Sequence, residues 1–207
     1  MSGREISYLI APSNDSTVAV EVSKKSFFRR SKHFLAFENF NGELQYTPDD
    51  LTAWRLKIRV DARSVVCRDK RVKSDKKRRR ITDYARGPAL AVNEHAEIHF
   101  SSNKIIPKRL RGFVVEGTLT IRGETRAVNA NVVLSPRKNG RFQIDADATV
   151  LLSDFGIEAP SAYSGLVAID NEVSLRLLLW ATPVGAAAAA EESAGSNSDR
   201  TVPGTDN

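Results

Sequence analysis

The chain has 207 residues, of which 41% are hydrophobic and 27% charged. This length suits one domain, and the composition is ordinary for a soluble globular protein. The longest apolar run, Leu177 to Ala181, is far short of the roughly 20 residues that a membrane-spanning helix needs. Because Met1 to Ile10 lacks the apolar core of a signal peptide and the single cysteine, Cys67, permits no internal disulfide, we expect a cytoplasmic protein.

The net charge of +6 is concentrated in one segment, Arg68 to Arg80. Nine Lys or Arg and two Asp residues give this segment a charge of +7, which leaves −1 for the other residues. The sequence therefore predicts a nearly neutral domain with one basic patch.

Alternation of apolar and polar residues predicts a series of β-strands, each with one dry and one wet face. In chain order these are Ile6 to Ile10, Val18 to Val22, a long bent strand from Phe34 to Tyr46 with its corner at Asn41-Gly42, Trp54 to Val60, Ala96 to Phe100, Phe113 to Arg122, Val128 to Leu134, Phe142 to Leu152 and Val173 to Leu179. About eight antiparallel strands make the fold all-β, as either a closed barrel or a sandwich.

The most regular part of the pattern is a hairpin from Phe113 to Leu134. Gly123 supplies the backbone freedom that its tight turn needs. Gly117 falls on the dry face in the middle of the first strand, where a missing side chain often marks a bend or the close approach of a ligand. We expect Gly117 to leave free space there.

Arg68 to Ala85 lacks strand alternation and predicts one helical insertion. Ser74 can cap a helix that begins at Asp75, and Gly87-Pro88 is expected to end it. We divide the chain into a lead-in at 1–15, a barrel domain at 16–184 and a disordered tail at 185–207, because the tail is of low complexity and has no apolar periodicity.

Four motifs in order resemble those of the YceI-like family, bacterial lipocalin-like barrels associated with polyisoprenoid lipids. They are Phe40-x-Gly42-x-Leu44 followed by Pro48-Asp49-Asp50, Ile98-x-Phe100-Ser101-Ser102, Gly117-x-Leu119-Thr120-Ile121-x-Gly123-x-Thr125, and Ser153-Asp154-Phe155-Gly156-Ile157. The resemblance covers roughly Ser16 to Ala181. It implies an eight-stranded lipocalin-like barrel that binds an apolar lipid.

The chain departs from the family pattern at several positions. Lys24-Lys25 stands where the family usually has a histidine, and the segment around the insertion is far more basic than the family pattern. These departures leave the inferred fold intact but put the identity of any ligand in doubt.

The dry faces of the strands allow two interpretations, a filled core or a cavity that holds one small ligand. The family resemblance favours a cavity. The candidate ligand-binding residues share these dry faces and are Phe34, Trp54, Ile58, Phe100, Phe113, Val115, Gly117, Leu119, Phe142, Ile144, Leu175 and Leu177.

No motif predicts catalysis, a cofactor or a metal. The chain has no Gly-x-Ser-x-Gly elbow and no phosphate-binding glycine-rich loop. His95 and His99 would lie about 13 Å apart on a strand, too far to ligate one metal ion. We therefore expect a binding protein that is not an enzyme.

The basic segment has two interpretations as well, a solvated charged helix or a surface that docks on anions. Its candidate anion-binding residues are Arg68, Lys70, Arg71, Lys73, Lys76, Lys77, Arg78, Arg79 and Arg80. The segment has no interleaved aromatic residues for stacking on bases. An anionic membrane surface is therefore a better partner than a nucleic acid recognised by sequence.

Overall fold

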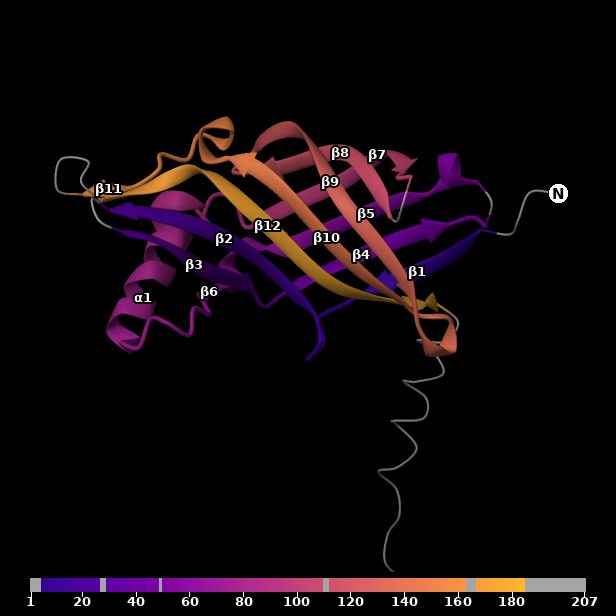
Figure 1. Cartoon of the computed structure of the whole chain (residues 1–207), viewed down its shortest axis with the longest axis horizontal. Coiled ribbons are helices and arrows are strands. Elements are labelled where there is room, and N and C mark those ends of the chain that lie inside the picture. The colour runs from indigo at the N-terminus through magenta and orange to yellow at the C-terminus, as the bar shows by residue number, and fades with distance from the viewer. Residues whose placement is uncertain (1–4, 27–28, 49, 110–111, 163–166, 185–207) are drawn as a thin grey trace, which may run out of the picture.

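The computed structural model of the chain describes residues 5–26, 29–48, 50–109, 112–162 and 167–184 (Figure 1). Its strands are β1 (Ile6–Ile10), β2 (Thr17–Ser26), β3 (Arg29–Phe37), β4 (Phe40–Tyr46), β5 (Arg55–Asp61), β6 (Val65–Cys67), β7 (Glu97–Pro107), β8 (Phe113–Ile121), β9 (Glu124–Pro136), β10 (Phe142–Leu151), β11 (Ser161–Ala162) and β12 (Val167–Pro183). The pairing order β1-β4-β5-β7-β8-β9-β10-β12 returns to β1, so the sheet closes on itself. The predicted eight-stranded antiparallel barrel is confirmed.

The first three strands of the barrel are bent, and each is divided into two segments. β1 pairs with β4 while β2 pairs with β3, so these four segments form one long hairpin. β5 and β6 continue the order beside β4 and β3. The second bend lies at Glu38-Asn39 and not at Asn41-Gly42 as predicted, because Gly42 pairs regularly with Ile10 and Ile58.

Hydrogen bonds hold two of the bends together. The amide of Asp61 donates to the carbonyl of Asn39 at 2.9 Å, and the Ser64 hydroxyl accepts from the amide of Asn39 at 3.1 Å. The same hydroxyl donates to the carbonyl of Asp61 at 2.6 Å. The bends therefore satisfy backbone groups that the interrupted strand ladder leaves unpaired.

The central hairpin turns as predicted. Ile121 pairs with Glu124, and the two residues between them have positive φ, 53° at Arg122 and 77° at Gly123. Two positive φ angles in a two-residue loop define the hairpin turn whose twist matches that of its strands.

The helical insertion is α1 (Asp75–Tyr84), capped by the Ser74 hydroxyl, which accepts from the amide of Lys77. Gly87-Pro88 does not end it, because a π-helical turn continues through Ala85–Ala89. The helical insertion lies beside β6, which is the last strand in the pairing order. The amide of Cys67 donates to the Thr82 hydroxyl at 3.0 Å, and Arg86 Nε donates to the carbonyl of Val65 at 3.1 Å.

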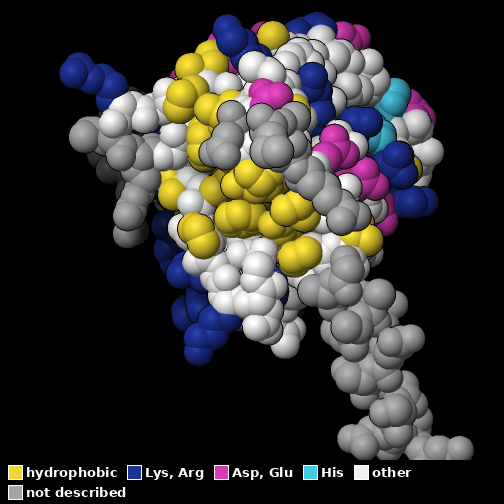
Figure 2. Space-filling model, turned by 90° about the vertical axis from the view of Figure 1, so that its right-hand side faces the viewer, with side chains coloured by type: hydrophobic (Ala, Val, Ile, Leu, Met, Phe, Trp, Pro, Cys, Tyr) yellow, Lys and Arg dark blue, Asp and Glu magenta, His cyan; other side chains and the backbone are white. Residues whose placement is uncertain are grey.

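The two ends of the barrel differ. The helix α1 lies at one end and β1 at the other (Figure 1). Figure 2 looks onto the β1 end and shows hydrophobic side chains gathered there. Among the exposed large hydrophobic residues, Ile6 and Leu9 lie on β1 and Val184 directly follows β12. The predicted tail at 185–207 lies outside the described residues, and no helix in the described part is long and apolar enough to cross a membrane.

Candidate ligand cavity

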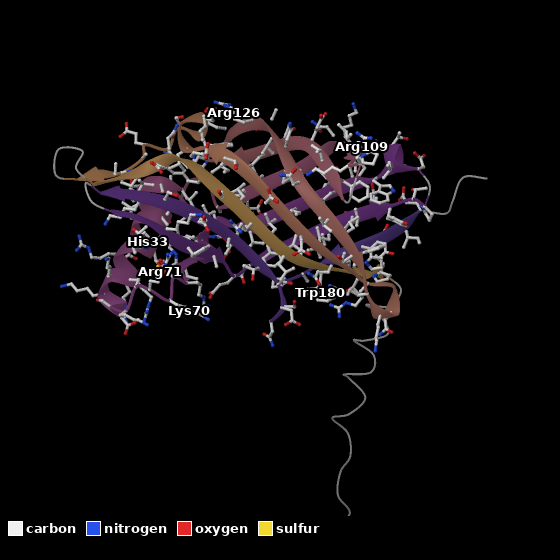
Figure 3. The ribbon with its side chains drawn as sticks, in the orientation of Figure 1. His33, Lys70, Arg71, Arg109, Arg126 and Trp180 are labelled. Carbon is white, nitrogen blue, oxygen red and sulfur yellow. The ribbon has the colours of Figure 1, made fainter. Side chains whose placement is uncertain are left out.

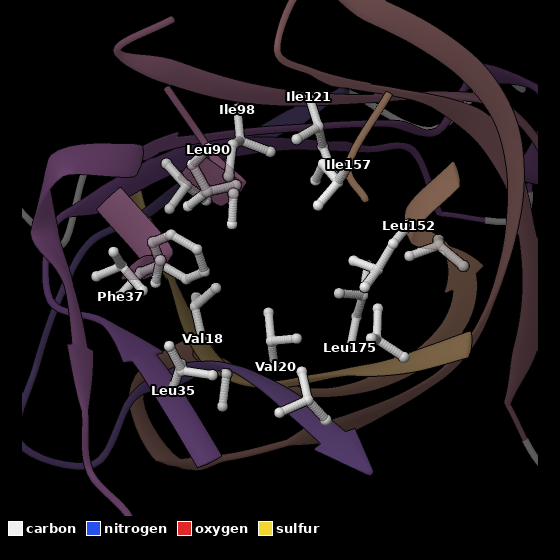
Figure 4. Close-up of a pocket in the computed structure, with 18 of the residues that line it drawn as sticks. Val18, Val20, Leu35, Phe37, Leu90, Ile98, Ile121, Leu152, Ile157 and Leu175 are labelled. Carbon is white, nitrogen blue, oxygen red and sulfur yellow. The ribbon is translucent and has the colours of Figure 1, made fainter. Parts of the chain in front are cut away.

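A cavity of about 780 Å³ lies inside the barrel. Its lining residues come mainly from the helical insertion and from strands β2, β3, β5, β6, β7, β8, β9, β10 and β12. Its wall is made almost entirely of aliphatic and aromatic side chains, which surround an open space (Figure 4). The volume lies within the roughly 300–1,000 Å³ of typical small-molecule sites. The interior is therefore not completely filled by its own side chains.

Six of the candidate residues line this cavity. They come from four of the strands and are Ile58, Phe100, Val115, Leu119, Leu175 and Leu177. Each points inward because alternation places every second residue of a strand on the inner face.

Four other candidates lie at the β1 end of the barrel, where the interior is filled. Trp54 packs on Tyr46 and Phe113, with ring centroids 4.6 Å and 5.3 Å away. Tyr8 and Phe142 complete this group of rings, which we call the aromatic plug, with centroids 5.2 Å apart. Ile144 borders only a void of about 10 Å³ beside Trp54 and Phe113. The plug closes the barrel at this end, and Trp54, Phe113, Phe142 and Ile144 do not line the large cavity.

Two further candidates are placed differently from our expectation. Phe34 lies on the outer face of β3, where its ring lies 5.6 Å from the guanidinium of Arg71, while its neighbour Leu35 lines the cavity. Gly117 is buried and faces inward, but the ring of Phe100 fills the space beside it. The expectation that Gly117 leaves free space is therefore wrong.

Sequence reasoning missed much of the cavity wall. Val18, Val20 and Val22 of β2 line it, and their alternation was a visible signal of an inward face. Ile81, Tyr84 and Ala85 of the helical insertion line it too. Their helical spacing marks one face of a helix, but nothing in that spacing shows that the face closes a barrel.

The cavity opens to solvent beside α1, and this mouth is polar. Lys77, Arg80 and Tyr84 of α1 are exposed, and each also lines the cavity. Lys24 of β2 and His33 of β3 line it as well. Burial raises the pKa of Tyr84, and the nearby negative charge of Glu158 raises it further.

His33 is held at the mouth by a buried carboxylate. Its Nδ1 lies 2.8 Å from Oδ2 of Asp69, which is only 2% exposed. The amide and Nε of Arg71 donate to the other oxygen of Asp69, both at 2.9 Å. His33 and Arg71 lie near each other at the α1 end of the barrel (Figure 3). Burial acts to raise the pKa of Asp69, but these hydrogen bonds outweigh it and the pKa is lowered. Asp69 is therefore ionised at neutral pH, and His33 Nδ1 donates to it.

The cations of the basic segment fall into three groups. Arg68, Arg71 and Arg78 form ion pairs with Glu38, Asp69 and Asp75. Lys77 and Arg80 line the cavity mouth. Lys70, Lys73, Lys76 and Arg79 are exposed and have no ion-pair partner among the described residues. The segment is thus neither wholly solvated nor one continuous anion surface.

In the described part of the chain, no cluster of three or more His, Cys, Asp or Glu side chains could hold a metal ion. The apolar wall and the cationic mouth suit binding of an apolar molecule that carries a polar end.

A closed antiparallel barrel of eight strands around an apolar cavity defines a lipocalin-like fold. The YceI-like domain model matches residues 8–181, and the chain belongs to this family.

Curated relatives were found in Vibrio cholerae. A UPF0312 protein from this organism is 26% identical over 137 residues, which are 62% of this chain. The match spans 66% of the length of that relative. It adds a distant relationship in sequence to the match with the family.

Solved structures share the fold. BcnA of Burkholderia cenocepacia aligns with a TM-score of 0.63 and 20% identity, covering 81% of this chain and 96% of its own. A polyisoprenoid binding domain from Saccharophagus degradans, implicated in plant cell wall breakdown, aligns with a TM-score of 0.57 and 12% identity over 84% of this chain and 98% of its own. The YceI protein of Campylobacter jejuni aligns with a TM-score of 0.52 and 14% identity. The alignment covers 70% of this chain and 82% of the Campylobacter jejuni chain. At these identities the likeness is one of fold.

Proposed function

We propose that this protein binds an elongated apolar lipid, such as an isoprenoid, inside its barrel and carries or sequesters it without catalysing a reaction. The observation that carries the proposal is the apolar cavity of about 780 Å³, closed by the aromatic plug and open beside α1. A blind-ended apolar cavity with one polar mouth suits a molecule with a long apolar chain.

The physical driving force is the removal of the lipid chain from water. Burial contributes about 25 cal/mol per Å² of apolar surface. Association opposes this through the loss of translational and rotational freedom and the ordering of the chain. The surplus is enough for binding in about the micromolar range, since that range requires about 8 kcal/mol.

The family supports the choice of ligand class. The Saccharophagus degradans protein of the same fold is a polyisoprenoid binding domain, and an isoprenoid chain is long, flexible and apolar. The proposed transfer of this ligand class to the present chain is supported by the cavity wall, which is apolar along its whole length below the mouth.

Native mass spectrometry of protein purified from its own host, followed by lipid extraction, tests the proposal. We expect a mass shift that disappears on extraction with solvent and an apolar lipid in the extract. Protein treated with solvent and refolded is the matched control and should regain the mass shift when geranylgeraniol is added. Empty protein across several preparations, together with no uptake of geranylgeraniol, would contradict lipid binding.

A second candidate function is docking on an anionic membrane through the basic segment. The observation that favours it is the group of exposed cations Lys73, Lys76 and Arg79, which have no ion-pair partner among the described residues and lie on or beside α1, near the cavity mouth. Each cation near an anionic surface contributes about 1 kcal/mol. Binding to phosphatidylglycerol vesicles should weaken steeply as salt increases, whereas lipid uptake into the cavity should not. Vesicle binding that persists unchanged at high salt would contradict this role.

A further inference from the structure

The lining of the cavity changes from apolar to basic near the mouth, on three separate elements. Along β2 the inward residues are Val18, Val20, Val22 and then Lys24. Along the cavity-facing side of α1, Ile81 and Ala85 lie deeper, and Lys77 and Arg80 precede them toward the helix N-terminus. Strand β3 changes in the same direction, from Phe37 and Leu35 to His33.

The register of the sheet shows that the changes on β2 and β3 lie within two residues of each other. His33 pairs with Val22, and Lys24 pairs with Ser31, two residues further along each strand in the same direction. The polar lining residues, which we call the rim, therefore gather toward the mouth and are not scattered over the wall. The deeper wall beside Lys24 and His33 remains apolar.

The cations of this rim are not neutralised by the protein itself. Lys24, Lys77 and Arg80 have no carboxylate within ion-pair distance among the described residues, although other cations of the same segment, such as Arg71 and Arg78, are paired. Glu158 is a nearby acid, and its charge acts on the Tyr84 phenol. The rim thus presents three cations to the cavity mouth, with His33 beside them.

We propose that the ligand is an amphiphile with a phosphate-bearing head, and that Lys24, Lys77 and Arg80 bind this head while the chain fills the cavity. This inference rests on the proposed function, because it needs a chain inside the barrel.

A phosphate head matches the rim in charge and in hydrogen bonding. A phosphate monoester carries about −1.5 to −2 charges at neutral pH and three strong acceptor oxygens. The ammonium groups of two lysines and the guanidinium of an arginine can surround such a head, and charge-assisted hydrogen bonds of this kind are the strong ones. The apolar wall around the rim excludes water on one side and strengthens them.

The test compares two probes with the same chain, geranylgeranyl phosphate and geranylgeraniol, by isothermal titration calorimetry. We expect the full-length protein to bind the phosphate at least tenfold more tightly than the alcohol. The double variant Lys77→Gln/Arg80→Gln should lower the affinity for geranylgeranyl phosphate about tenfold, equivalent to about 1.4 kcal/mol. This loss should remove most of the preference for the phosphate. The alcohol should bind both proteins equally. Lys24→Gln, on a different element, should weaken the phosphate in the same way.

The helix supplies a matched control. Lys76→Gln/Arg79→Gln removes the same two residue types and the same charge from adjacent positions that do not line the cavity. This variant should keep the full preference for the phosphate. Equal losses in the two double variants would overturn the inference, because they would show only the general positive field of the helix.

Other outcomes separate this inference from the proposed function. Equal binding of both probes to every variant would overturn the phosphate site and leave lipid binding intact. Failure of both probes to bind would contradict the proposed function itself. Inorganic phosphate alone should bind far more weakly than geranylgeranyl phosphate, and comparable affinity would overturn recognition of a lipid head in favour of a free-anion site. Binding to phosphatidylglycerol vesicles through Lys73, Lys76 and Arg79 should weaken more in Lys76→Gln/Arg79→Gln than in Lys77→Gln/Arg80→Gln, because only the first variant removes two of those cations.

Discussion

The ring of Phe100 on β7 packs against Gly117 on the neighbouring strand β8. A Cβ at Gly117 would lie 2.7 Å from Cε2 and Cζ of that ring and 2.5 Å from the carbonyl oxygen of Ser101. The φ angle of Gly117 is not in the left-handed region. Glycine is therefore needed at this position for space and not for backbone conformation. Because Phe100 also lines the cavity, Gly117 sets how far one part of the wall extends inward.

We expect Gly117→Ala alone to destabilise the barrel by about 1–3 kcal/mol, since even one methyl group overpacks this contact. Phe100→Leu should recover part of that loss in the double variant, because it removes the ring but not the clash with the Ser101 carbonyl. Urea unfolding of the four proteins in a double-mutant cycle measures the coupling. Simple additivity of the two substitutions would contradict the contact.

The sequence predicted the inner face of most strands but not how deep along the barrel each residue lies. Alternation places Leu119 and Trp54 on inner faces, yet Leu119 lines the cavity whereas Trp54 belongs to the aromatic plug. Depth depends on strand register and on which residues from other strands meet at one level, and a period of two contains no such information.

Two local errors have specific causes. The run from Phe34 to Phe37 is continuously apolar, so it has no alternation that would fix the face of Phe34. The space at Gly117 was misjudged because a missing side chain in one strand does not reveal a ring on the next. The capping of α1 by Ser74 was predictable, since it depends only on local sequence.

The stability of the mouth should depend on pH through Asp69. Its pKa is lowered in the folded protein, since its hydrogen bonds from Arg71 and His33 outweigh the effect of burial. A lowered pKa stabilises the fold at pH values above the unfolded pKa, about 3.9, and this contribution is lost as the pH falls through the folded value. We expect Asp69→Asn to destabilise the protein by about 2 kcal/mol at pH 7.

The difference between wild type and Asp69→Asn should begin to shrink as the pH falls below the unfolded pKa of about 3.9, and it should shrink further as the pH falls through the lower folded value. Urea unfolding of both proteins at pH 7 and at several values down to pH 3 measures it. Asp75→Asn is a suitable control, since that carboxylate is 79% exposed and pairs with Arg78 at the surface. If the difference in unfolding free energy between wild type and Asp69→Asn stayed constant with pH, the charge of Asp69 would not be what stabilises the fold.

The aromatic plug should contribute to stability and not to lipid affinity. Trp54 is buried, and its Nε1 donates to the carbonyl of Thr47 at 2.8 Å. Trp54→Phe removes this hydrogen bond and part of the ring packing, so we expect a loss of about 1–2 kcal/mol in the free energy of unfolding. Affinity for geranylgeraniol, measured by calorimetry well below the unfolding temperature, should change less than twofold. A large loss of affinity would indicate that the lipid reaches the plug.

The cavity itself can be tested at Ala130 on β9. This small side chain lines the cavity, and it pairs with Val115 on β8 and with Ala148 on β10, which line it too. A phenyl ring at Ala130 would extend into open space, so Ala130→Phe should lower the affinity for geranylgeraniol by about tenfold or more. Because the ring fills empty volume and does not overpack a core, the free energy of unfolding should change by less than about 1 kcal/mol.

The same strand offers a control for this substitution. Ala127 lies three residues earlier on β9 and is exposed on the outer surface. Ala127→Phe adds the same ring outside the barrel and should leave geranylgeraniol binding unchanged. If Ala130→Phe destabilised the protein by several kcal/mol, the region around Ala130 would be packed. If that variant stayed folded and bound geranylgeraniol as tightly as wild type, the lipid would occupy a site other than this cavity.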